Sequence, residues 1–323
     1  MVMKVLITGG AGFVGSHLAE LLLARGDRVV AVDDLSTGGR ENIAAIDHHK
    51  NFQLVVGSVL DDDLIDPLVR DVDLVFHLAS TVGVRLVVEN PLRTIKTIVR
   101  GTEALLDAAQ RHRRRILITS SSEVYGKGSR VPFSESDDVV FGPTTIPRWS
   151  FAASKMLDEF MALAHWHETQ LPVVCARLFN TVGPRQTGRY GMVLPQFVKQ
   201  ALTQEALTVY GDGKQTRCFG HVADVTDALV TLIDCTQALG RVVNIGSDQE
   251  VSIDELARRV IGRTSAKSQI VHVPYEQAYG VGYEDMPRRV PDLTLARELI
   301  GYRPRYDLDS IIDSIVAYQR GDG

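Results

Sequence analysis

Residues 8–15, "TGGAGFVG", decide the fold. They place Gly9, Gly12 and Gly15 at every third position, between an apolar run at 3–8 and a helical pattern at 15–26. Glycines permit a tight turn and a close approach of the backbone, so a pyrophosphate can lie on the helix N-terminus and its amides. The stretch, with Phe13 and Val14 between the last glycines, therefore predicts a dinucleotide site.

The second apolar run, "DRVVAVDDL" at 27–35, supports this interpretation through Asp33. An acidic residue near the end of that strand can accept hydrogen bonds from a ribose diol. Its charge repels a 2′-phosphate, so the sequence favours NAD over NADP.

Further apolar runs follow at 52–59, 72–80, 114–122 and 171–180, with helical patterns such as 101–112 between them. They are continuous Val/Ile/Leu runs rather than alternating ones, which is typical of a parallel sheet covered on both faces. We expect an α/β fold: a Rossmann-type doubly wound parallel sheet over residues 1–180, the NAD-binding domain. Residues 181–323 are expected to form mainly a smaller C-terminal α/β domain, with some segments returning to the first.

Bulk properties exclude several classes. The chain has 323 residues, 45% of them hydrophobic, and a net charge of -5. Its one basic run, 111–115, lies where a helix should end, so it predicts a helix cap and no nucleic-acid partner. Three widely spaced cysteines predict neither a disulfide framework nor a metal site. The N-terminal apolar run is too short for a signal peptide or membrane span, so we expect a cytoplasmic protein.

The motifs together resemble one family. "TGGAGFVG", "HLAS" at 77–80, "SSSEVYG" at 120–126, the "SK" pair at 154–155 and "RLFNTVGPR" at 177–185 follow the order and spacing of the extended short-chain dehydrogenase/reductases that modify nucleotide sugars. The resemblance implies cofactor contacts at Ser58, Val59, Leu78 and Ala79. It also implies that Ser121 is the catalytic hydroxyl and that Lys155 contacts the nicotinamide ribose.

Phe151 departs from that family at the position of the catalytic tyrosine, four residues before Lys155. In the family the tyrosine takes the proton of the sugar 4-hydroxyl, and the lysine lowers its pKa. Phenylalanine has no ionisable group, so activity is expected to be impaired. The change is either natural or a deliberate Tyr-to-Phe substitution; the intact surroundings favour the substitution.

Ser122 and Glu123 narrow the chemistry. The Ser–Glu pair resembles the UDP-glucuronate decarboxylases, in which the glutamate handles C5 or the carboxylate. Arg217 is then a candidate for the phosphate or the carboxylate, because a guanidinium matches both. The alternative is a UDP-sugar 4-epimerase, supported by Val87 at a position where the decarboxylases usually have tyrosine. A third possibility is a non-catalytic protein that binds NAD and a nucleotide sugar, supported by Phe151.

The resemblance also implies where the UDP-sugar lies. It assigns Asn180, Arg185 and Arg289 to the nucleotide end, the first and last of them to the diphosphate, while Val209 and Tyr210 would flank the base. Arg85, just upstream, is either a contact for an anionic sugar or a solvated surface arginine. Family members usually form homodimers through two helices each, one of them following Phe151, and we expect the same here.

Overall fold

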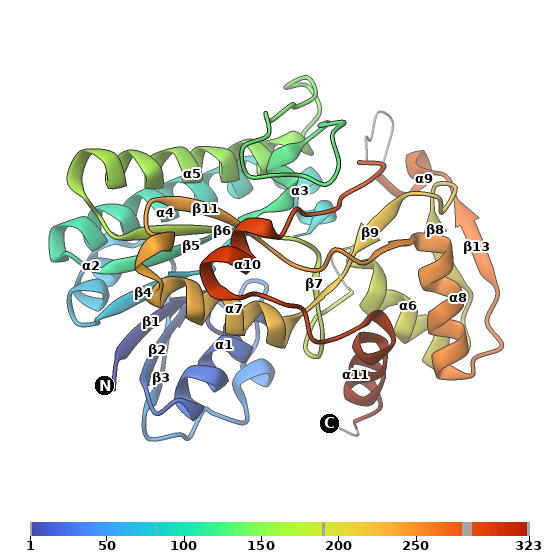
Figure 1. Cartoon of the computed structure of the whole chain (residues 1–323). Coiled ribbons are helices and arrows are strands. Elements are labelled where there is room, and N and C mark those ends of the chain that lie inside the picture. Colours follow the sequence, from blue (N-terminus) through green and yellow to red (C-terminus); the bar gives the residue numbers. More distant parts are fainter. Residues whose placement is uncertain (1, 82, 189–190, 280–285, 322–323) are drawn as a thin grey trace.

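A parallel sheet of seven strands forms the centre of the molecule in the computed structural model, which describes residues 2–81, 83–188, 191–279 and 286–321 (Figure 1). The strand order is β11-β6-β5-β4-β1-β2-β3. Its strands are β1 (Lys4–Thr8), β2 (Arg28–Asp33), β3 (Phe52–Val56), β4 (Leu74–His77), β5 (Arg115–Ser121), β6 (Val173–Leu178) and β11 (Arg241–Ile245). The doubly wound sheet expected from the sequence is confirmed.

Helices cover both faces of this sheet. Alternate residues of β1 point to opposite faces: Val5 and Ile7 enter one apolar core and Leu6 the other. The first core includes side chains of α1 (Phe13–Ala24), α7 (Val222–Asp234) and α10 (Thr294–Ile300). The second includes side chains of α2 (Asp62–Arg70), α4 (Pro91–His112) and α5 (Trp149–Thr169). Burial on both faces explains why the strands are continuous apolar runs in the sequence.

A smaller body lies beside the carboxyl ends of the strands and has its own apolar core, which includes Val182, Phe197, Leu256 and Ile312 (Figure 1). Its helices are α6 (Val193–Leu202), α8 (Ile253–Thr264), α9 (Tyr275–Tyr279) and α11 (Leu308–Arg320). Three two-stranded pairs accompany them: β7 (Thr181–Val182) with β10 (Gly220–His221), β9 (Thr216–Cys218) with β12 (Glu250–Ser252), and β8 (Leu207–Tyr210) with β13 (Ile270–Val273).

Segments beyond residue 180 do return to the central sheet. β11 pairs with β6 at its edge, and α7 and α10 cover the face that also holds α1. The short α3 (Val84–Glu89) precedes α4. The division at residue 180 stays a prediction, with these returning segments belonging to the first body by packing.

No helix in the described ranges is long and apolar enough to cross a membrane. The cytoplasmic location stays a prediction.

Candidate functional site

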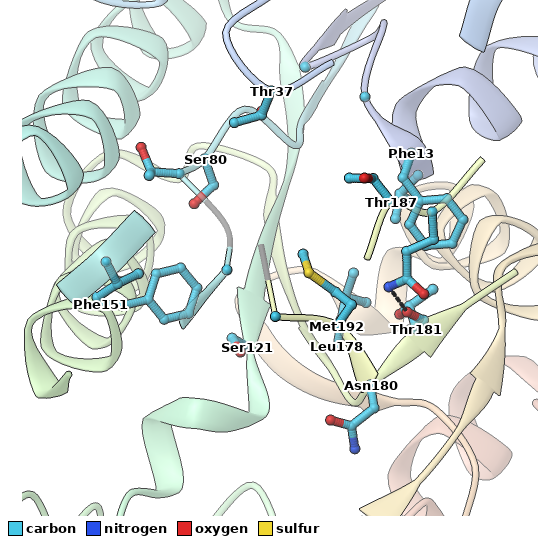
Figure 2. Close-up of a pocket in the computed structure, with 18 of the residues that line it drawn as sticks. Phe13, Thr37, Ser80, Ser121, Phe151, Leu178, Asn180, Thr181, Thr187 and Met192 are labelled. Carbon is cyan, nitrogen blue, oxygen red and sulfur yellow. Dashed lines mark hydrogen bonds between the residues drawn. The ribbon is translucent and has the colours of Figure 1, made fainter. Parts of the chain in front are cut away.

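A cavity of about 570 Å³ lies between the sheet's carboxyl edge and the smaller body. Its wall combines residues of the glycine turn, the ends of β2 to β5, the start of α5 and the strands of the smaller body. Figure 2 shows Phe151 at one side of this cavity and Phe13 at the other, with Ser121, Leu178 and Met192 between them.

The glycine turn fits a dinucleotide. Gly9 has a φ of 72°, and its N–H donates to the carbonyl of Val32 at 2.8 Å. A Cβ on Gly15 would lie 2.1 Å from the Gly9 carbonyl oxygen, so the turn can only close with glycine there. Gly12 is the N-cap of α1 and, as a glycine, makes no side-chain cap hydrogen bond. Gly9, Gly12, Phe13 and Val14 line the cavity, whereas Gly15 lies behind it.

Asp33 lies at the end of β2 and lines the same part of the cavity. Its Oδ2 accepts from the N–H of Ala11 at 3.0 Å and its Oδ1 from Leu35 at 2.8 Å. Burial raises the pKa of Asp33, although these backbone hydrogen bonds oppose the shift. The cavity wall also contains the remaining cofactor residues implied by the family resemblance: Ser58, Val59, Leu78 and Ala79.

The expected catalytic residues line the same cavity. Ser121 ends β5, and its Oγ accepts from the Glu123 N–H at 3.2 Å, where a short 3-10 helix begins. Phe151 and Lys155 are one turn apart on α5 and both line the cavity. Lys155 is 3% exposed, and its Nζ donates to the Thr119 carbonyl at 3.0 Å.

Glu123 lies between two arginines. Its Oε2 is 3.1 Å from Arg148 Nη1, and its Oε1 is 2.7 Å from Arg289 Nη2. Burial alone would raise the pKa of Glu123, but Arg148, Arg289 and Arg217 together lower it to about 2. Arg217, on β9, is held by the carbonyls of Thr216 and Met286 and also lines the cavity. The wall near Glu123 therefore carries more positive than negative charge, which suits an anionic ligand.

Arg148 does not emerge from sequence reasoning. It is 5% exposed, lines the cavity and precedes the helix that carries Phe151. Its position in the sequence could have indicated a role in the site, because Arg148 comes only three residues before the expected tyrosine position. Charge alone, however, does not say which of the 35 lysines and arginines turns inward.

Ser122 lines the cavity and is 1% exposed; its Oγ has no hydrogen-bond partner in the described part of the chain. Such a buried hydroxyl is available to a ligand. The side chain of Arg85 lies outside the described residues. Val87, in place of the decarboxylase tyrosine, is 4% exposed and lines the cavity.

The nucleotide end contains one correction. Tyr210 lines the cavity together with Thr208, but Val209 between them is fully buried in the core of the smaller body. Successive side chains of a strand point to opposite sides, so β8 cannot present both Val209 and Tyr210 to one ligand. Thr208 and Tyr210 are thus the β8 side chains that line the cavity, and a contact of β8 with the base stays a prediction.

Asn180 and Arg185 both line the cavity. Asn180 Nδ2 donates to the Cys218 carbonyl at 2.9 Å, and this hydrogen bond fixes the orientation of the Asn180 amide group. Arg185 reaches α1, where its Nη2 lies 2.6 Å from Glu20 Oε1 and its Nη1 donates to Ser16 at 3.3 Å. Arg185 therefore joins the smaller body to the helix of the glycine turn.

The known proteins that this chain resembles include enzymes that modify nucleotide sugars. The family model for GDP-mannose 4,6 dehydratase matches residues 6–315. A UDP-N-acetyl-alpha-D-glucosaminuronate decarboxylase of Bacillus cytotoxicus is 40% identical over 98% of both chains. UDP-glucuronic acid decarboxylase 1 of Danio rerio is 36% identical over 98% of this chain and 72% of its own length. A solved UDP-glucuronic acid 4-epimerase from Bacillus cereus, in complex with UDP-glucuronic acid and NAD, has a TM-score of 0.89 at 26% identity, covering 99% of this chain and 100% of its own.

Proposed function

We propose that this chain, which belongs to the extended short-chain dehydrogenase/reductase family matched by the GDP-mannose 4,6 dehydratase model, decarboxylates a UDP-linked uronate through a 4-keto sugar. UDP-glucuronate and its 2-acetamido form are the two candidate substrates, since relatives of both names align over nearly the whole chain. The observation that carries the proposal is Glu123 between Arg148 and Arg289, in the wall that also holds Lys155.

Oxidation of the sugar at C4 makes the loss of its carboxylate easy. NAD, when bound, accepts the hydride from C4. The ketone left at C4 is β to the carboxylate, so the electrons of the breaking C–C bond flow into an enolate and carbon dioxide leaves. In this proposal Ser121 hydrogen-bonds the 4-oxygen, and Arg217 and Arg289 hold the phosphate and carboxylate charges, since a guanidinium binds both in bidentate fashion.

Product mass tests the proposal. The chain and its Phe151→Tyr variant are incubated with NAD and with UDP-glucuronate, UDP-N-acetylglucosaminuronate or UDP-glucose. A product lighter by one carbon dioxide from either uronate supports decarboxylation. Failure of both proteins to change any of the three sugars would instead indicate a binding protein without catalysis.

A 4-epimerase is the second candidate. Val87 leaves the cavity without the tyrosine of the decarboxylases, and the solved 4-epimerase shares the fold along its entire length. In the same incubation, unchanged mass with an inverted C4 would establish this activity and refute the first.

The NAD site makes a prediction of its own. Gly15→Ala should weaken NAD binding at least about tenfold, or about 1.4 kcal/mol, because its Cβ would overlap the Gly9 carbonyl and push the turn away from the pyrophosphate. Fluorescence titration with NADH measures it. Gly262→Ala on α8, where a Cβ meets nothing within 4 Å, is the matched control and should bind as the parent does. Equal affinity of Gly15→Ala and parent would contradict the proposed site.

Dimerisation through α4 and α5 is also part of the proposal. These helices pack together, and each exposes two apolar side chains: Leu92 and Ile95 on α4, 65% and 39% exposed, and Leu157 and Phe160 on α5, 43% and 61% exposed. Phe160→Glu should convert a dimer into a monomer in analytical ultracentrifugation, because it places a charge in the apolar contact. Val271→Glu, at an exposed apolar residue of β13, should leave the dimer intact. A parent that sediments as a monomer at micromolar concentration would refute the contact.

A further inference from the structure

Behind the cavity, Lys155 has an acidic partner that the family resemblance does not assign. Lys155 Nζ lies 3.3 Å from Oδ2 of Asp158, one turn further along α5. Asp158 is fully buried and does not line the cavity, whereas Lys155 does. Lys155 is therefore the connection between this carboxylate and any molecule bound in the cavity.

A row of buried polar side chains continues from Asp158 toward the glycine turn. The hydroxyl of Thr102, on α4, is close enough to Asp158 to lower its pKa. Thr102 Oγ1 contacts His77 Nε2 at 3.1 Å, and His77 Nδ1 contacts Thr8 Oγ1 at 2.7 Å. The two ring nitrogens of His77 are thus occupied, whereas Oδ1 of Asp158 is buried and has no hydrogen-bond partner in the described part of the chain.

The ionisable groups around Asp158 differ in what they can do. Burial raises the pKa of Asp158 to about 6, although Lys155 and Thr102 oppose the shift. Burial, and next Lys155, lower the pKa of His77 to about 3, so the imidazole is neutral near pH 7. Burial holds the pKa of the Cys175 thiol, on β6, well above its usual value. Glu159 is occupied by Arg177, whose Nε and Nη2 donate to it at 2.9 and 2.7 Å.

Asp158 is thus a buried carboxyl whose raised pKa allows its protonation state to change near neutral pH. Asp158 lies directly behind Lys155, which lines the cavity. The same wall holds Phe151, which has no phenol to take the substrate's proton. A family enzyme with tyrosine there has a proton acceptor facing the sugar. This chain has a lysine that faces the cavity and a carboxylate behind it.

We propose that in this chain Lys155 and Asp158 form a proton relay that replaces the missing phenol: Lys155 takes the proton of the sugar 4-hydroxyl while it passes one of its own protons to Asp158. The inference rests on the proposed function. The O–H bond of the alcohol breaks as an N–H bond forms on Lys155, and another N–H bond of Lys155 breaks as an O–H bond forms on Asp158. The hydride leaves C4 for the nicotinamide dinucleotide of the proposed function, and both transfers reverse when the ketone is reduced.

Four proteins test the relay: the chain itself, Phe151→Tyr, Asp158→Asn and the double variant. Single-turnover oxidation of the UDP-uronate is followed by NADH absorbance. With phenylalanine at 151, Asp158→Asn should slow oxidation by about 10²–10⁴-fold, the usual contribution of a positioned base. With tyrosine at 151 the same change should cost less than about tenfold, because the phenol accepts the proton. Asp107→Asn, at an exposed carboxylate of α4, is the control and should change neither rate.

The pH profile adds a readout that a merely structural residue would not change. Asp158 accepts a proton only when ionised, so the rate of the parent should be full above pH 6 and fall as pH drops through about 6. In the Phe151→Tyr protein this limb should be absent. Infrared titration without substrate provides a second test: a carboxylic-acid band should appear as pH falls through about 6 and be absent from Asp158→Asn.

The outcomes separate the relay from the function. An equal loss from Asp158→Asn with phenylalanine or tyrosine at 151 overturns the relay and leaves Asp158 as a positioning residue for Lys155. Turnover only when residue 151 is tyrosine also overturns it while the function stands. No turnover by any of the four proteins refutes the proposed function, and the infrared titration then decides on the ionisation of Asp158 alone. NADH titration of Asp158→Asn shows whether that variant folds; if it does not, the parent's pH profile and infrared band still decide.

Discussion

In the Asp158→Asn protein, where the proposed relay no longer replaces the phenol, Phe151→Tyr should accelerate oxidation of the UDP-uronate by about 10²–10⁴-fold, the largest gain we expect from one substitution. The ring of residue 151 already faces the cavity, and Lys155 follows it by one turn of α5 (Figure 2). A phenol at this position would face the sugar with an ammonium group nearby, and that positive charge lowers the pKa of the phenol. The added oxygen would therefore be both placed and activated to take the proton of the 4-hydroxyl.

Stopped-flow absorbance of NADH in a single turnover measures this gain, since it isolates oxidation from product release. Phe160→Tyr adds the same oxygen to an exposed phenylalanine of the same helix and should leave the rate unchanged. An Asp158→Asn protein that oxidises substrate as fast as the double variant would show that the phenol is not the limiting proton acceptor.

The central sheet could be predicted from sequence because its strands are short and, except for β3 at the edge, mostly buried on both faces. The glycine turn at residues 9–15 and the apolar runs up to residue 180 identify β1 to β6 in order. β11 could not be placed in the same way: "RVVNI" at 241–245 is apolar enough for either body, and its partner β6 lies far back in the chain. Pairing over such a distance leaves no local pattern.

The candidate site was predictable where it follows a motif and unpredictable where it depends on packing. Ser121 and Lys155 lie at fixed places after a strand and on a helix, and the structure brings both to the cavity. Val209 fails because β8 turns it into the core. The sequence could have predicted that Asp158 lies near Lys155, since an acid three residues after a lysine lies on the same side of a helix. Its complete burial was not visible in the sequence.

Arg289→Met should weaken binding of the UDP-uronate by about 2–5 kcal/mol, a loss of roughly 30- to 4,000-fold. Arg289 is 7% exposed, and its Nη2 lies 2.7 Å from Glu123 Oε1. Its removal takes away a cation for the ligand and leaves one oxygen of Glu123 without that partner. Both changes lower the affinity, because the cavity wall loses a positive charge and the Glu123 carboxylate, no longer paired with Arg289, repels an anionic ligand more strongly.

The neighbouring arginine is a close control. Arg288 pairs with Glu250 on the surface and its side chain is 56% exposed, so Arg288→Met should change binding by no more than about 1 kcal/mol. Calorimetric titration of the NAD-loaded protein with UDP and with UDP-glucuronate measures both variants. A similar loss from Arg288→Met would show that the effect is general charge rather than contact.

The two ligands also locate the contact. If Arg289 holds the diphosphate, Arg289→Met weakens the binding of UDP and of UDP-glucuronate by the same factor. A loss confined to UDP-glucuronate would assign Arg289 to the carboxylate instead.

A change in the pH dependence of stability should accompany Arg289→Met. Because Arg148, Arg289 and Arg217 outweigh burial and hold the pKa of Glu123 at about 2, its ionised form stabilises the fold above its unfolded pKa. That contribution is lost as pH falls toward 2. Without Arg289 the folded pKa rises, so the acid limb of unfolding should move to higher pH, whereas Arg288→Met should leave the limb unmoved.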